Sequence, residues 1–249
     1  MTAAAQILLE ACVDSVVSAR NAEAGGARRL ELCANLVEGG TTPSIGMLAG
    51  ARDAVGIPIF VLVRPRGGDF LYGADEIRVI LRDIAEMKAR GADAVVIGAL
   101  DREGQVDRNV IGRLIEAARP LAVTFHRAFD LARDPIEALE TLIELGIERV
   151  LTSGQAPTAE QGIPLLRELV QRAEGRIVLL AGGGVNASNA RRIVEETGVR
   201  ELHLRGSRTE PSPMRWKREH VPMGKPYQPD EYCRTETDAA AIRAVLEAV

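Results

Sequence analysis

Two glutamate and cysteine pairs with the same spacing are the most chemically suggestive feature of the sequence. Glu10 is followed two residues later by Cys12, and Glu31 is followed two residues later by Cys33. Side chains alternate along a β-strand, so the two members of each pair share one face. Thiolates are ligands for soft metal ions, and carboxyl groups serve as general acids and bases. The pairs therefore indicate a metal site or a site for acid–base chemistry.

The same alternation places further polar side chains on the inner faces of other expected strands. His126 follows Thr124 by two residues, and Arg205 follows His203 by two. Arg64 comes at the end of another apolar run. Buried charges cost several kcal/mol unless they are paired or bind something. This interior predicts a candidate catalytic set of Glu10, Glu31, His126 and His203.

A second group of residues is suited to holding an anion. Arg64 and Arg66 can bind a carboxylate or phosphate through paired hydrogen bonds. Glycine-rich turns after late strands can cradle phosphate with backbone N–H groups, and a tight strand-to-helix turn is the alternative explanation. The candidate residues in these turns are Gly182, Gly183, Gly184, Gly206 and Ser207.

Eight short runs rich in aliphatic residues alternate with helical segments and predict the elements that position these groups. The segment 76–90 has a helical apolar stripe ending at Gly91, and Asp134 with Pro135 is a helix start. No GxGxxG turn follows the first strand, which disfavours a doubly wound sheet. The pattern predicts a single (β/α)8 TIM barrel with strands at 7–12, 29–33, 58–64, 94–99, 121–126, 148–153, 177–181 and 201–205.

The pattern changes after the eighth strand. We expect the barrel to occupy about 7–207, an extended arm about 208–235 and a terminal helix about 236–248. Residues 208–232 contain five of the twelve prolines, the only tryptophan and two of the three tyrosines. The apolar side chains of this arm must pack across the barrel or on a second subunit; they are Met214, Trp216 and Tyr227.

Composition excludes several classes of function. The chain has 249 residues, with 31 basic and 35 acidic side chains and only 3% aromatic residues. These values are unlike those of a general nucleic-acid-binding protein. There is no apolar run long enough for a membrane helix and no secretory signal pattern. Three cysteines without a CxxC pair favour reduced thiols, with Cys233 an ordinary free thiol, so we expect a cytoplasmic protein.

Several longer strings resemble those of the CutC family of copper homeostasis proteins. The resemblance covers about residues 7–216 and implies a TIM barrel, a cytoplasmic location and self-association as a dimer or tetramer. It also implies a role in copper handling, with Cys12 and Cys33 at the positions of the copper ligands. Residues 204–208 depart from the small, serine-rich segment of the family. The strings are LEAC at 9–12, RLELCA at 29–34, EGGTTPS at 38–44, RPRGGDF at 64–70, TFHRAFD at 124–130 and LTSGQ at 151–155.

Two functional hypotheses follow. In the first, Cys12 and Cys33 bind Cu(I), a soft ion that accepts two thiolates, and His126 or His203 supplies a third ligand. In the second, the glutamates and histidines make the protein a lyase, isomerase or hydratase acting on a small sugar-like, phosphorylated or carboxylated compound. Structural ion pairs that fix the barrel register are the competing explanation of the charged interior.

Overall fold

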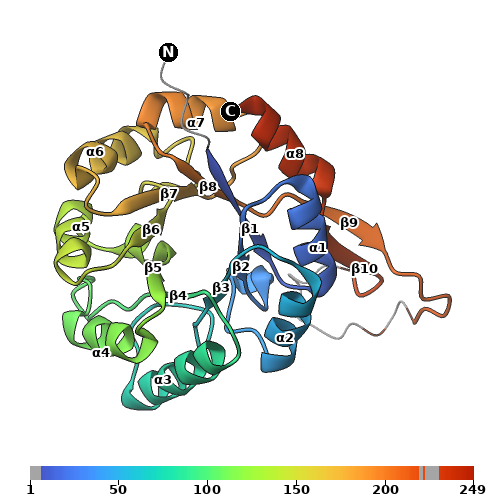
Figure 1. Cartoon of the computed structure of the whole chain (residues 1–249), viewed down its shortest axis with the longest axis horizontal. Coiled ribbons are helices and arrows are strands. Elements are labelled where there is room, and N and C mark those ends of the chain that lie inside the picture. Colours follow the sequence, from blue (N-terminus) through green and yellow to red (C-terminus); the bar gives the residue numbers. More distant parts are fainter. Residues whose placement is uncertain (1–6, 219–220, 222–229) are drawn as a thin grey trace.

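A computed structural model describes residues 7–218, 221 and 230–249. Eight parallel strands close into a barrel in which each strand pairs with its neighbours in sequence and β8 pairs with β1, as Figure 1 shows. The predicted TIM barrel is confirmed. The observed strand ends lie within two residues of the predicted ones; the strands are β1 Leu8–Val13, β2 Arg29–Leu32, β3 Ile59–Leu62, β4 Ala94–Ile97, β5 Ala122–Phe125, β6 Arg149–Thr152, β7 Val178–Gly182 and β8 Glu201–Leu204.

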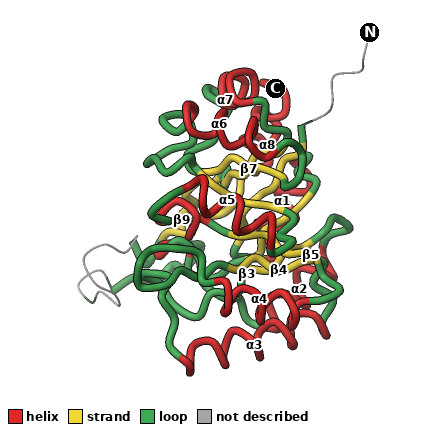
Figure 2. Tube along the Cα trace, turned by 90° about the vertical axis from the view of Figure 1, so that its left-hand side faces the viewer, coloured by secondary structure: helices red, strands yellow, loops and turns green. Residues whose placement is uncertain are grey.

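Helices surround the barrel, and the side view in Figure 2 shows strands enclosed between them. None of the helices that the structure describes is long and apolar enough to cross a membrane. The α-helices are α1 Val16–Gly25, α2 Ile45–Ala54, α3 Ala74–Ala89, α4 Arg108–Ala118, α5 Pro135–Glu144, α6 Ile163–Ala173, α7 Ala190–Thr197 and α8 Ala239–Ala248, and the short 3-10 helices are η1 Leu36–Glu38 and η2 Arg127–Leu131.

Local sequence signals set the ends of these helices. The side chain of Asp134 accepts hydrogen bonds from the backbone N–H groups of Ile136 and Glu137 at the start of α5. Pro135 occupies the first helical position, where no backbone donor is required. After α3, Gly91 adopts a left-handed conformation with φ of 83°. Both predicted helix signals are therefore present as expected.

The barrel strands carry two different faces. The outward face packs against the helices and holds fully buried leucines such as Leu9, Leu30 and Leu32. The inward face has a small apolar cluster around Cys12 and Cys33. The remaining inward positions are occupied largely by charged and hydroxyl side chains, so apolar burial holds the wall in place and leaves polar groups inside.

The C-terminal segment contains a strand pair that the expected arm lacks. Strand β9 (Ser207–Pro211) pairs antiparallel with β10 (Cys233–Thr237), and Figure 1 shows this ribbon outside the barrel. Helix α8 follows β10 and begins three residues later than expected. The side chain of Trp216 is 67% exposed, and that of Met214 is also exposed, so neither packs across the barrel. Tyr227 and His220 lie outside the described residues.

Candidate functional site

A cavity of about 320 Å³ opens at the C-terminal ends of the strands. Its floor and walls combine apolar side chains with a few charged ones. Most of these residues come from strand ends or from the loops that follow them. The lining residues are Cys12, Glu31, Leu36, Gly39, Leu62, Arg64, Phe70, His126, Arg127, Leu151, Gly183, Gly184, Val185, His203, Leu204, Arg205 and Gly206.

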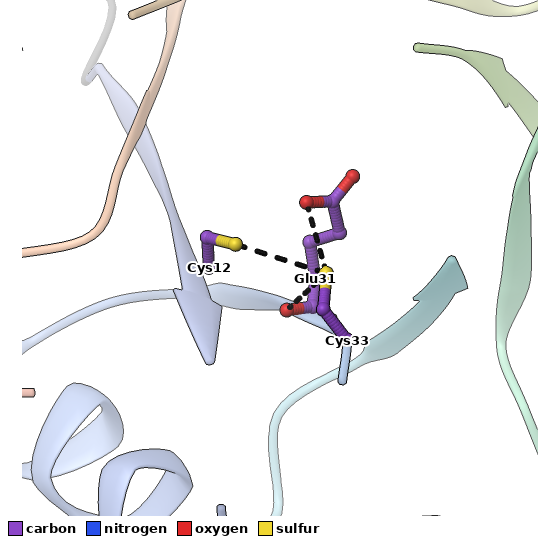
Figure 3. A group of neighbouring side chains, drawn as sticks. All are labelled: Cys12, Glu31 and Cys33. Carbon is purple, nitrogen blue, oxygen red and sulfur yellow. Dashed lines mark hydrogen bonds between the residues drawn. The ribbon is translucent and has the colours of Figure 1, made fainter. Parts of the chain in front are cut away.

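Strands β1 and β2 bring two thiols together at the floor of the cavity. Cys12 pairs in register with Glu31, and Cys33 follows two residues later, directly after the end of β2. The Sγ atoms of Cys12 and Cys33 are 3.7 Å apart, and Cys33 Sγ lies 3.4 Å from Oε2 of Glu31 (Figure 3). The ligand atoms of these three residues lie within 4.8 Å of one another, as a metal site requires.

His203 joins this cluster from β8. Its Nδ1 atom lies 2.8 Å from Oε1 of Glu10, and its Nε2 atom lies 3.8 Å from Oε2 of Glu31. Glu10 and His203 are register partners on adjacent strands. Glu10, Glu31 and His203 form a second group with ligand atoms within 4.8 Å of one another. The imidazole therefore links the thiol pair to a deeper carboxylate.

Burial and neighbouring charges set the protonation of the cluster. The hydrogen bond with Cys33 and the charge of His203 lower the pKa of Cys12 to about 5, although burial opposes this. The bond with Cys12 and burial raise the pKa of Cys33. Burial and the Cys12 charge raise the pKa of Glu31 to about 8. Burial disfavours the His203 cation, but the charge of Glu31 and bonds with Cys12 and Glu10 raise its pKa well above its usual value.

Beneath the cluster lies a set of ion pairs that we call the paired layer, formed by Arg29, Glu10, Glu201 and Arg149. Arg29 donates through Nε to Glu10 and through an Nη atom to Glu201, both at 2.5 Å. Arg149 also donates to Glu201, at 2.7 Å. Sequence reasoning missed Arg149 and Glu201. The signal was present for Glu201, because it precedes His203 by two residues and so shares its strand face.

Three further residues of the cavity lining have fewer charged partners, and we call Arg64, Phe70 and His126 the open wall. Arg64 lies beyond the end of β3 and stacks over the Phe70 ring, with its Cζ atom 5.0 Å from the ring centroid. The Phe70 and His126 ring centroids are 4.9 Å apart. A Cβ on Gly98 would lie 2.4 Å from the His126 ring, so only glycine there permits this ring position. Burial and the Arg64 charge lower the pKa of His126 to about 3.

Besides Cys33 and Gly182, three predicted site residues do not line the cavity. Arg66 donates to Glu76 at 2.5 Å and to Asp69 at 2.9 Å, so the cavity lining includes Arg64 but not Arg66, unlike the expected site for one anion between the two arginines. Ser207 is exposed at the start of β9 and does not line the cavity. Glu10 is fully enclosed between Arg29 and His203, in a position to orient the imidazole rather than to touch a ligand.

The predicted glycine cradle is only partly at the cavity. Gly183, Gly184 and Gly206 line it, whereas Gly182 belongs to β7. A Cβ on Gly182 would lie 2.6 Å from Leu151 and 3.1 Å from His203, so this glycine makes room for the histidine. Its role in the described chain is therefore close packing beside His203.

Comparison with known proteins identifies the family. The model of the CutC family matches residues 7–208. The chain belongs to the CutC family. It is 49% identical over 243 residues to a human protein named copper homeostasis protein cutC homolog, covering 98% of this chain and 89% of the human protein. It is 50% identical to a CutC family protein of Bacteroides thetaiotaomicron, covering 96% and 97% of the two chains.

A solved CutC structure agrees with the fold. The protein from Streptococcus agalactiae superimposes with a TM-score of 0.76 at 35% identity, covering 80% of this chain and 98% of that one. A thiamine phosphate pyrophosphorylase from Pyrococcus furiosus is 20% identical, with a TM-score of 0.55 and coverage of 80% of this chain and 86% of that one. At that level of identity, the likeness extends to the barrel alone. The CutC assignment therefore rests on the family match and the full-length relatives.

Proposed function

We propose that this CutC protein binds Cu(I) through Cys12 and Cys33 in the cytoplasm and thereby takes part in copper homeostasis. The observation that carries the proposal is the 3.7 Å separation of the two Sγ atoms. Metal–sulfur bonds in zinc thiolate sites are about 2.3 Å long, so two sulfurs at this separation lie within the span of one ion. The names of the human and mouse relatives support the same role.

The surroundings of the thiols favour a soft monovalent cation. Cu(I) accepts thiolate ligands in low coordination numbers, so two cysteines suffice. Cys12 lines the cavity and gives an ion access to the pair, while Cys33 lies beneath it with 1% of its surface exposed. His203 and Glu31 lie at the edge of the same cluster and are the nearest further donors. A reducing compartment keeps both thiols free, which is why the cytoplasm belongs to the proposal.

The deciding experiment is an anaerobic Cu(I) competition titration of the reduced full-length protein. We expect one tight equivalent of Cu(I), lost in the Cys12→Ser/Cys33→Ser double variant. Cys233→Ser is the matched control, because Cys233 is a free cysteine on β10, outside the barrel. Equal binding by the wild type and the double variant would overturn the proposal.

Proton release tests which atoms bind the ion. At pH 7 the lowered pKa leaves Cys12 ionised, whereas the raised pKa leaves Cys33 protonated. Binding by the two sulfurs should therefore release about one proton per ion, because a coordinated thiol must lose its proton. Calorimetry in buffers of different ionisation enthalpy measures this number. Release of no proton would contradict coordination by Cys33, because its protonated thiol must ionise to bind the ion.

Self-association as a dimer or tetramer is a separate proposal that concerns the arm. The exposed Trp216 and Met214 lie on the segment that follows β9, outside the barrel. Large apolar side chains exposed together mark association surfaces. We expect Trp216→Ser to shift the mass measured by size exclusion with light scattering towards the monomer. An unchanged mass would contradict a contact through Trp216, and a monomeric wild type would contradict self-association itself.

A further inference from the structure

Arg64 is a buried cation without a counter-ion among the residues that the structure describes. Only 6% of its surface is exposed, and it takes part in no ion pair there. Its Nη atoms donate to the carbonyl oxygens of Glu38, Gly40 and Gly68 at 2.8–2.9 Å. These bonds use three of the five guanidinium N–H donors, and the buried Nε atom has no partner. An isolated buried charge is costly, so the cavity beside it is suited to an anion.

His126 adds a second donor without an acceptor. Its Nδ1 atom accepts a hydrogen bond from the backbone N–H of Ala128 at 3.1 Å, which places the proton of the neutral ring on Nε2. That Nε2 atom is buried and has no hydrogen-bond partner in the part of the chain that the structure describes. The side chain is 5% exposed and lines the cavity. Two side chains from separate strand ends, each with an unused donor, thus line one cavity.

The other groups around the open wall do not supply the missing negative charge. Tyr72 lies near Arg64, and burial raises the pKa of its hydroxyl to about 12, so it is neutral. Arg127 and Arg205 add two further cations to the cavity lining. Their carboxylate partners are Asp130 at 2.6 Å and Asp14 at 3.9 Å. Glu31 is the only carboxyl group that lines the cavity within the described chain.

The apolar walls define the rest of the ligand. Phe70, Leu62 and Leu151 line the cavity beside the charged groups. The volume of about 320 Å³ is far more than a single ion occupies and lies at the lower end of the range typical of small-molecule sites. An inorganic anion would leave these apolar surfaces against water, whereas an organic anion would cover them.

We propose that the open wall binds a small organic anion, a carboxylate or a phosphate monoester on an apolar body, with Arg64 as its counter-ion and His126 as a second donor. Arg64 and His126 line the same cavity as Cys12, but the anion site does not rest on copper binding. The acid–base groups Glu31 and His203 face the same cavity, so a bound anion would lie beside them.

Calorimetric titration of the metal-free full-length protein at pH 7 tests the proposal with three probes of one shape. Benzoate and phenyl phosphate carry an anionic group on a phenyl ring, and benzamide is the neutral counterpart. At least one anion should bind about tenfold or more tightly than benzamide, because a hydrogen bond to a charged group contributes about 1.5–3 kcal/mol. The tighter of the two anions distinguishes a carboxylate site from a phosphate ester site.

Variants assign the binding to the open wall. Arg64→Met should reduce the affinity for the anion to that for benzamide, and His126→Asn should weaken it while keeping an acceptor for the Ala128 N–H. Arg66→Met is the matched control and should leave affinity unchanged, because Arg66 faces outward. The Cys12→Ser/Cys33→Ser variant should keep anion binding, which separates this result from the copper titration.

Two outcomes would overturn the inference. One is equal affinity for all three probes, or no binding of either anion. The other is an equal loss of affinity in Arg64→Met and Arg66→Met. If Arg64→Met does not fold, His126→Asn and the comparison of benzoate or phenyl phosphate with benzamide still decide the question.

Discussion

The paired layer and the open wall are two sets of buried charged or polar groups inside one barrel, and they differ in how they are compensated. In the paired layer, Arg29 lies between two carboxylates at 2.5 Å, and Glu10 also accepts from His203. In the open wall, Arg64 contacts carbonyl oxygens and an aromatic ring and has no carboxylate partner among the described residues, where His126 Nε2 also has no acceptor. The comparison separates charges that the fold neutralises from charges left for a ligand.

This difference also assigns roles to residues that look alike in the sequence. Glu10 and Glu31 precede cysteines with identical spacing, yet Glu10 is held as a carboxylate beneath the cavity and Glu31 reaches the cavity surface. Burial would raise the pKa of Glu10, but the His203 hydrogen bond and the Arg29 charge lower it to about 2. The paired layer therefore fixes the position of His203 in the cavity lining. For this layer, the geometry favours the explanation that the charges inside the barrel form structural ion pairs.

The largest expected effect is in the paired layer. Glu10→Ala removes the carboxylate that Arg29 and His203 share and leaves Arg29 with Glu201 alone, so it should lower the free energy of unfolding by about 3–5 kcal/mol. Urea denaturation followed by circular dichroism measures the loss. A loss below about 1 kcal/mol would show that the paired layer relaxes without cost, which would remove the distinction from the open wall.

The second prediction concerns the loss of stability at acidic pH that comes from His126 in the open wall. Burial and Arg64 lower the folded pKa of His126 to about 3, below its usual value of 6.5, so protons bind the unfolded chain first. The contribution of the neutral His126 ring to the free energy of unfolding is complete above pH 6.5. It is lost as the pH falls towards 3, by about 2 kcal/mol between pH 6.5 and 4.5. Denaturation across this range should show that loss in the wild type but not in His126→Asn. Parallel curves would contradict a buried neutral ring.

A smaller effect is expected for Arg64→Met in the absence of ligand. The substitution removes three hydrogen bonds to carbonyls but also an uncompensated charge, so the unfolding free energy should fall by only about 1–2 kcal/mol. Thermal and urea denaturation beside Glu10→Ala provide the test. A loss as large as that of Glu10→Ala would mean that Arg64 is a structural charge like Arg29.

The smallest effect is expected at the surface. Arg108 donates to Glu144 at 2.7 Å with both side chains more than half exposed. Glu144→Gln should change the unfolding free energy by less than about 1 kcal/mol, because solvent screens the pair. The same denaturation assay in added salt should reduce the difference further. A larger change would show that ion pairing as such, rather than burial, sets the scale of the first prediction.

Local pattern carries much of the information about the site. The alternation of side chains along strands is enough to place Glu10 with Cys12, Glu31 with Cys33 and Thr124 with His126 on shared faces. The rule works because the apolar face of each strand must meet the helices. It fails at Arg66, which lies in a loop, where no period predicts the direction of a side chain.

The sequence does not predict which charged side chains pair with one another. Nothing local shows that Arg29 meets Glu201, 172 positions later, or that Arg149 meets the same carboxylate. These contacts depend on closure of the barrel and on the register between strands. For the same reason, the sequence makes Arg64 and Arg66 equal candidates although only one of them is buried in the folded chain.

The sequence by itself determined the order of strands and helices, the helix ends at Asp134 and Gly91, and the inward direction of the cysteines, because these depend on hydrophobic period and short-range hydrogen bonding. The tertiary structure decided that two thiols lie 3.7 Å apart and that Arg64 lacks a carboxylate partner in the described chain. Distances between side chains on different strands follow from register and closure, which are properties of the whole barrel and of no single segment.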